Sequence, residues 1–147
     1  MPQCLHTFFP CYFDRDVVKI VLFLTCFGVV CDEEASMSQS GEYWGRAIAG
    51  LRQSGQQDYL ARGLLARAAY YREVGEYEKA QADLDEALEI AEDGAMKLFL
   101  VDYHLEAARL CFARKQKEQS HEHKQEAKKL IDETGYKRRL KDLEELN

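Results

Sequence analysis

The stretch LLARAAYYREVGEYEKAQADLDEAL, residues 64–88, decides the fold of this 147-residue chain. On both sides of Gly75 the apolar residues recur at intervals of three and four, which is the spacing of one face of an α-helix. Gly75 interrupts that pattern, and glycine commonly ends a helix because it readily adopts a left-handed conformation. The stretch therefore predicts two antiparallel helices joined by a short turn.

A similar apolar frame returns every forty residues, around Ala47, Ala87 and Ala127. A fixed period of this size is typical of helical repeat arrays, whose units bury their apolar faces on one another. We expect five amphipathic helices, at residues 41–54, 58–74, 77–92, 96–114 and 117–134, and a short helix after residue 135.

Helix ends are expected at three further glycines and one aspartate. Gly55 and Gly94 follow apolar-periodic stretches, so each is expected to end a helix in the left-handed conformation, and a further helix is expected to stop at Gly135. Asp58 precedes Leu60, and aspartate is a preferred residue at the start of a helix. We expect Asp58 to be the N-cap of its helix.

The central segment resembles a tetratricopeptide repeat, a helix–turn–helix unit of about 34 residues. The positions that carry the resemblance are Leu64, Ala68, Tyr71, Gly75, Tyr77, Ala80, Leu84 and Ala87. It implies an all-α fold in which antiparallel helix pairs stack as a short α-solenoid of about two units and half of another. The stretches at residues 51–66, 96–98 and 135–139 resemble the C-terminal repeat region of large bacterial tetratricopeptide proteins, and this resemblance spans about residues 41–146. In those proteins, such repeats often follow a nucleotide-binding signalling module.

The second unit departs from this pattern. Lys115 stands in place of the turn glycine, Ser120 in place of Ala80, and Lys124 in place of Leu84. A lysine at a packing position puts the first half of its helix in doubt. We therefore interpret the second unit as a degraded one that closes the array with a polar surface.

Three regions follow from the composition: an apolar segment over residues 1–40, helical repeats over 41–134 and a capping helix over 135–147. The first segment holds four of the five cysteines and five of the seven phenylalanines, and its structure is not defined by its pattern. Three interpretations stay open: buried strands or a helix left from an upstream domain, an export or membrane-tethering segment over residues 17–31, and non-native sequence.

The charge bounds the class of partner. A net charge of −6 argues against a nucleic-acid binder, which would show a basic stripe. Residues 73–93 contain nine acidic residues and one lysine, which predicts either a solvated helix face or a platform for a basic partner. Because the cysteines are concentrated before residue 32, the repeats are expected to fold without disulfides. This favours a cytoplasmic protein, and a membrane is not expected as its partner.

No motif predicts catalysis. The sequence has no phosphate-binding glycine loop, no Gly-x-Ser-x-Gly and no His-Glu-x-x-His. His121 and His123 are two residues apart, so their side chains point in different directions on a helix. His104 and Cys111 occupy packing positions, and a hydrated helix surface accounts for carboxylates such as Asp83. We expect no enzyme activity, no cofactor and no metal site.

The resemblance also implies a binding groove, because the first helix of each pair lines the concave side of such arrays. The groove positions carried over to this chain are Arg62, Leu65, Ala69, Arg72, Asp102, Leu105, Arg109 and Phe112. Arginine binds carboxylates in a bidentate manner, so an acidic peptide or C-terminus is one expected ligand. The alternative is that these arginines pair with Glu73, Glu106 or Asp102 and only keep the surface soluble.

The expected function is therefore a non-catalytic protein–protein interaction module or scaffold with a protein or peptide partner. Two alternatives remain. The chain could be the C-terminal sensor or regulatory fragment of a larger nucleotide-binding signalling protein, or a membrane- or envelope-attached assembly factor. The sequence specifies neither the partner nor the oligomeric state.

Overall fold

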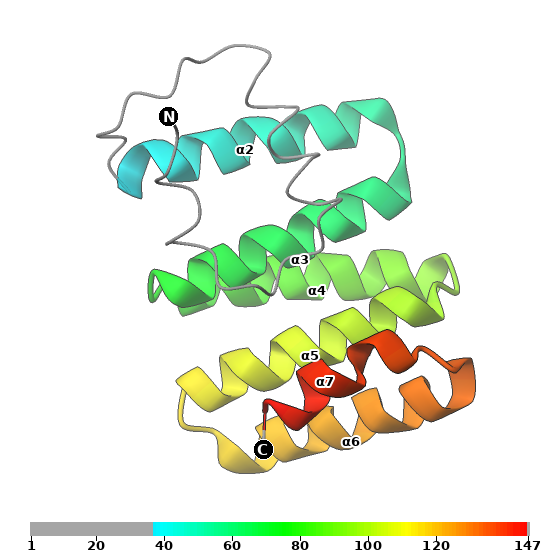
Figure 1. Cartoon of the computed structure of the whole chain (residues 1–147). Coiled ribbons are helices and arrows are strands. Elements are labelled where there is room, and N and C mark those ends of the chain that lie inside the picture. The colour runs from blue at the N-terminus through cyan, green and yellow to red at the C-terminus, as the bar shows by residue number, and fades with distance from the viewer. Residues whose placement is uncertain (1–36, 147) are drawn as a thin grey trace, which may run out of the picture. The chain divides into compact units, whose positions relative to one another are not determined.

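The computed structural model describes residues 37–146, and this part of the chain is all-α, as expected (Figure 1). A new helical element begins at every twentieth residue from Met37 to Lys137. The elements are α2 (Met37–Ser54), α3 (Gln57–Glu73), α4 (Tyr77–Asp93), α5 (Lys97–Ala113), α6 (Lys117–Thr134), η1 (Lys137–Arg139) and α7 (Leu140–Glu144).

Several expectations concern residues that the structure does not describe. The apolar stretch 17–31 and the four cysteines before residue 32 lie outside the described residues. Between residues 37 and 146, which the structure describes, no helix combines the length and the apolar character that crossing a membrane requires. The helix expected from residue 41 begins earlier, at Met37.

The described residues fall into two compact units, which are divided between residues 56 and 57. In the first unit, α2 buries Trp44, Ala47, Ile48 and Leu51, which follow one another at intervals of three, one and three residues. These intervals place the four side chains on one helix face, as the sequence predicts. The second unit holds α3 to α7.

Helices of the second unit pack in adjacent antiparallel pairs, α3 with α4 and α5 with α6, and α4 also packs on α5 (Figure 1). The first core cluster lies between the α3–α4 pair and α5. It consists of buried residues Ala68, Ala80, Leu84, Tyr103, Ala107 and Leu110. Ala68 and Ala80 are fully buried, so only residues this small fit where the helices approach.

The second core cluster lies between α5, α6 and α7, and it consists of Val101, Leu105, Ala127, Ile131 and Leu143. Forty residues after Ala68 and Ala80, the crossing of α5 and α6 has Ala108 and Ser120. Ser120 is also buried, and its Oγ donates a hydrogen bond of 2.9 Å to the carbonyl of Ala108. The hydroxyl is thereby satisfied inside the core, which explains why serine is tolerated there.

The turns repeat as regularly as the helices. A residue with positive φ occurs every twenty positions, at Gly55 (69°), Gly75 (82°), Ala95 (50°), Lys115 (63°) and Gly135 (71°). In the three middle turns the next amide donates to the carbonyl five residues back: Glu76 to Tyr71, Met96 to Ala91 and Gln116 to Cys111, each at 2.8 Å. This is the Schellman arrangement that ends a helix.

Two expected helix boundaries are wrong. Gly94 has φ of −83°, and the left-handed conformation belongs to Ala95 instead. The reason is that Gly94 still donates to the carbonyl of Ile90 within the last helical turn, so the reversal comes one residue later. Asp58 is not the N-cap either, because α3 begins at Gln57 and places Asp58 inside its first turn.

Candidate functional site

The residues expected to line a groove all lie on α3 and α5, which contact each other directly. We call these eight residues the α3–α5 face: Arg62, Leu65, Ala69, Arg72, Asp102, Leu105, Arg109 and Phe112. Within each helix they follow at intervals of three and four, so they form one stripe per helix. Among the eight, Phe112 is the exposed one, at 64%, whereas Ala69 and Leu105 are buried. The others are half-buried.

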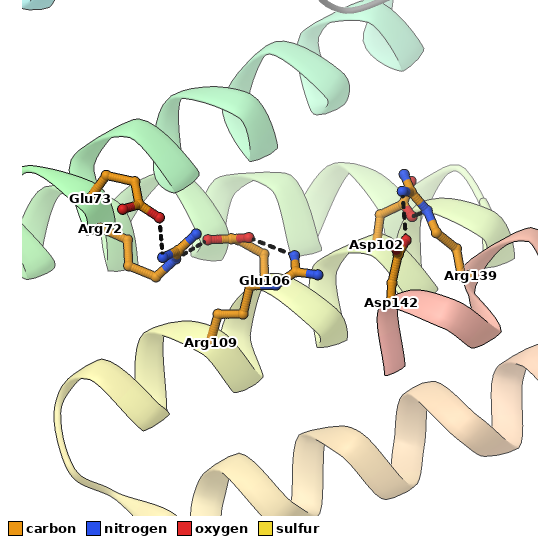
Figure 2. Close-up of polar contacts among 7 residues, drawn as sticks. All are labelled: Arg72, Glu73, Asp102, Glu106, Arg109, Arg139 and Asp142. Atoms are coloured by element: carbon orange, nitrogen blue, oxygen red, sulfur yellow. Dashed lines mark hydrogen bonds and ion pairs between the residues drawn. The ribbon is translucent and has the colours of Figure 1, made fainter. Parts of the chain in front are cut away.

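Glu106, a neighbour of this stripe, organises one end of the face (Figure 2). Its carboxylate accepts a hydrogen bond of 2.6 Å from Nε of Arg72 and one of 3.0 Å from Nη1 of Arg109. Arg72 also donates from Nη1 to Glu73 at 2.6 Å. Glu106 is buried, at 6% exposure, so its charge is compensated by two guanidinium groups inside the protein.

This network holds Arg72 in the charged state. Burial alone would lower the pKa of Arg72, but the negative charges of Glu106 and Glu73 raise it above its usual value. The pairing of groove arginines with the chain's own carboxylates, which the sequence left open, is thus present for Arg72 and Arg109. A ligand would meet a surface whose charges are already balanced and positioned.

Asp102 is engaged by the C-terminal elements (Figure 2). Arg139, in η1, donates from Nε to Asp102 at 2.6 Å and from Nη1 to Asp142 at 2.9 Å. Burial raises the pKa of the Asp102 carboxyl, and the charge of Arg139 partly opposes this. Together with Leu143 in the second core cluster, this contact places α7 on the first half of α5. The expected groove residue Asp102 therefore contacts the chain's own C-terminal segment.

Arg62 contacts an aromatic ring. Its guanidinium carbon lies 5.3 Å from the centroid of the Phe99 ring, which is within the range of a cation–π interaction. Its charge also lowers the pKa of Asp102, although burial of that carboxyl has the larger effect. Arg62 thus links α3 to the first half of α5.

The positions that carry the repeat resemblance are structural. Leu64, Ala68, Ala80, Leu84 and Ala87 are buried, Tyr71 and Tyr77 pack against the first core cluster, and Gly75 makes the left-handed turn. Asp83 was expected on a hydrated surface, and this is wrong. It is 4% exposed and accepts hydrogen bonds of 2.7 and 2.6 Å from Arg67 of α3. The pair ties α3 to α4 through a bidentate contact.

Sequence reasoning missed a pair of histidines that join α5 to α6. Nδ1 of His104 lies 3.0 Å from Nδ1 of His123, and the Tyr103 ring makes a T-shaped contact with each of the two rings. Burial, together with the charge of His123, lowers the pKa of His104 to about 4. Burial also lowers the pKa of His123.

The forty-residue period contains a signal for this pair. At the equivalent positions of the α3–α4 pair stand Leu64 and Asp83, so two unrelated residues have both become histidine. Spacing within one helix relates His104 only to Cys111, and His123 only to His121, so it does not bring the two histidines together. No cluster of three or more potential metal-ligating side chains occurs between residues 37 and 146.

The chemistry of the α3–α5 face suits recognition. Its arginines form ion pairs and a cation–π contact, and Phe112 offers a large apolar surface. Charged groups held in fixed positions beside an exposed aromatic ring can bind polar and apolar parts of one ligand together. Comparisons with family models, curated proteins and solved structures found no match to this chain.

Proposed function

We propose that this protein is a non-catalytic protein–protein interaction module of the tetratricopeptide type, which binds a peptide segment of its partner on the α3–α5 face. The observation that carries the proposal is the 64% exposure of Phe112 one turn after Arg109, whose guanidinium is held by Glu106. Phenylalanine, like the other aromatic residues, and arginine are enriched in protein interfaces relative to the rest of the surface.

The ion pairs of this face differ in how easily a ligand can replace them. Glu106 is buried between two arginines, so its removal would leave buried charges uncompensated. Glu73 is an exposed partner of Arg72, with a side chain 63% exposed, and a pair of this kind contributes little free energy. A ligand carboxylate can therefore displace Glu73 from Arg72, while Glu106 keeps the guanidinium in place.

We infer a ligand that carries a carboxylate for Arg72 and an apolar side chain for Phe112. The carboxylate would be an acidic side chain or a chain terminus, because arginine binds both through paired N–H donors. The acidic residues of α4 do not exclude a ligand with a carboxylate, because most of them lie at exposed positions of a helix that is not part of the α3–α5 face.

The test is binding of the full-length protein to a displayed library of peptides that combine acidic and apolar residues. We expect Phe112→Ala to weaken binding of the selected peptides by about tenfold or more, a typical loss for a central aromatic anchor. Leu98→Ala is the matched control, because Leu98 is 47% exposed near the other end of the same helix.

Glu73→Gln is the second informative variant. Because it removes the carboxylate that competes for Arg72, it should maintain or strengthen binding of acidic peptides. Selection of no peptide, or equal affinities for the parent, Phe112→Ala and Leu98→Ala proteins, would overturn the proposal.

A further inference from the structure

We propose that His104 and His123 together bind a divalent transition-metal ion, of which Ni²⁺ and Cu²⁺ fit best. The site is separate from the α3–α5 face and does not rest on the function proposed for that face. Its two ligands come from different helices, α5 and α6, so a bound ion would connect them.

The distance between the two Nδ1 atoms fits a shared ion. The two Nδ1 atoms face each other at 3.0 Å. Two imidazole nitrogens bound at right angles to one ion, each about 2.0–2.1 Å from it, lie about 2.9 Å apart. Right angles occur in the square-planar and octahedral arrangements of Cu²⁺ and Ni²⁺. A tetrahedral ion such as Zn²⁺ needs about 3.3 Å and would have to widen the pair.

The contact between the two rings leaves a ring nitrogen available to a metal. At 3.0 Å, at least one of the two Nδ1 atoms must be an unprotonated acceptor. Without a metal, one Nδ1–H donates to the other Nδ1. When a metal binds, that ring carries its proton on Nε2 instead, and both Nδ1 lone pairs reach the ion without net loss of a proton.

The surrounding charges favour a cation. Burial is the main reason that the pKa of each ring is lowered. The negative charges of Glu126 on His104 and of Glu122 on His123 act in the opposite direction, because they favour a positive charge at the rings. No third His, Cys, Asp or Glu joins the pair within residues 37–146. Water must therefore complete the coordination, as in a site from which the ion exchanges readily.

Packing alone does not account for this pair. In the α3–α4 pair, the equivalent residues are Leu64, which is fully buried, and Asp83, which binds Arg67. In the α5–α6 pair, Ala107 replaces that arginine and both other positions are histidine. A half-buried polar pair stabilises a core less than an apolar residue does. A departure of this kind from a local packing pattern is expected where a site is built.

The test is a calorimetric titration of the metal-free full-length protein with Ni²⁺. We expect the affinity of one site to fall by at least about tenfold in His104→Leu and in His123→Gln, since even the loss of an outer-shell contact costs that much. His121→Gln is the matched control, because His121 is exposed on α6 and bonds to Gln125 at 2.8 Å. It should leave this site unchanged.

Nuclear magnetic resonance of the parent protein gives an independent reading. Paramagnetic Ni²⁺ should broaden the ring signals of His104 and His123 at lower concentration than those of His121. Equal affinities in all variants, or broadening of His121 before the pair, would overturn the proposal and leave a pair that shares only a proton. If either variant fails to fold, as judged by circular dichroism, the broadening in the parent protein decides.

Discussion

Arg72 on α3 and Glu106 on α5 are 34 positions apart in the sequence, and their Nε and Oε1 atoms are 2.6 Å apart in the structure. The contact joins the first helices of the two helix pairs in the second unit. Because Glu106 is also bound by Arg109, its carboxylate is fixed from two sides. The ion pair thus holds α3 in register with α5 and orients the arginines of the face.

We expect Glu106→Ala to lower the free energy of unfolding by about 3 kcal/mol, because it leaves two guanidinium groups without their buried counter-charge. The matched variant Glu73→Ala removes the exposed partner of the same arginine and should change it by at most about 0.5 kcal/mol. Urea denaturation followed by circular dichroism measures both. Similar effects of the two variants would contradict the assignment of Glu106 as the organising residue.

The helix crossing between α3 and α4 gives a second prediction. Ala80 is fully buried, so Ala80→Leu should overpack the core and lower the free energy of unfolding by about 1–3 kcal/mol. Ala82→Leu adds the same side chain at an exposed position of α4, where about 0.5 kcal/mol or less is expected. Thermal melts of the two variants compare them directly. A neutral Ala80→Leu would mean that the helices are not in close contact there.

The turn between α5 and α6 gives a third prediction. Lys115 has φ of 63°, a conformation that costs a side-chain-bearing residue about 1 kcal/mol. Lys115→Gly should therefore raise the free energy of unfolding by up to about 1 kcal/mol, reduced by the greater freedom of glycine in the unfolded chain. Lys128→Gly, at an exposed position within α6, should instead lower it by about 1 kcal/mol. Chemical denaturation distinguishes the two signs.

The histidine pair predicts that the free energy of unfolding depends on pH. Burial lowers the pKa of His104 from 6.5 in the unfolded chain to about 4 in the folded one. Between these values the unfolded state binds the proton and the folded state does not, so stability falls as pH decreases through this window.

The measurement is the melting temperature of the parent protein and of His104→Leu, both without metal, from pH 7 to pH 4. The melting temperature of the parent should fall further on acidification than that of the variant, because the two proteins share their other titratable groups. Parallel curves would show that His104 does not contribute.

Local chemistry made the helices and most turns predictable. The apolar spacing located every helix from α3 to α6 to within a few residues, and Gly75 marked its turn because glycine commonly adopts positive φ. Gly94 misled for the same reason, since the residue type suggested a conformation that the hydrogen bonds place at Ala95. The lysine at position 124, which raised doubt about α6, bonds to the carbonyl of Leu146 and leaves the helix intact.

Contacts between helices were beyond the reach of the sequence pattern. Whether Arg72 meets a ligand or Glu106 depends on the rotation of α3 against α5, which no spacing within either helix defines. The same holds for His104 and His123, whose approach follows from the register between α5 and α6. A capping helix was expected after residue 135. The hydrogen bond from Arg139 to Asp102 could not be predicted, because it depends on where this segment lies against α5.

The twenty-residue spacing of left-handed turns has a consequence for how such a protein can change in length. A block that runs from one turn to the turn forty residues later contains one whole helix pair and begins and ends in the same backbone conformation. Duplication or loss of such a block keeps every downstream helix in phase, whereas insertion of a single residue within a helix would rotate the apolar face of the rest of that helix by about 100°, away from the core. The regular turns thus make gain and loss of whole pairs the genetic change that this architecture tolerates best.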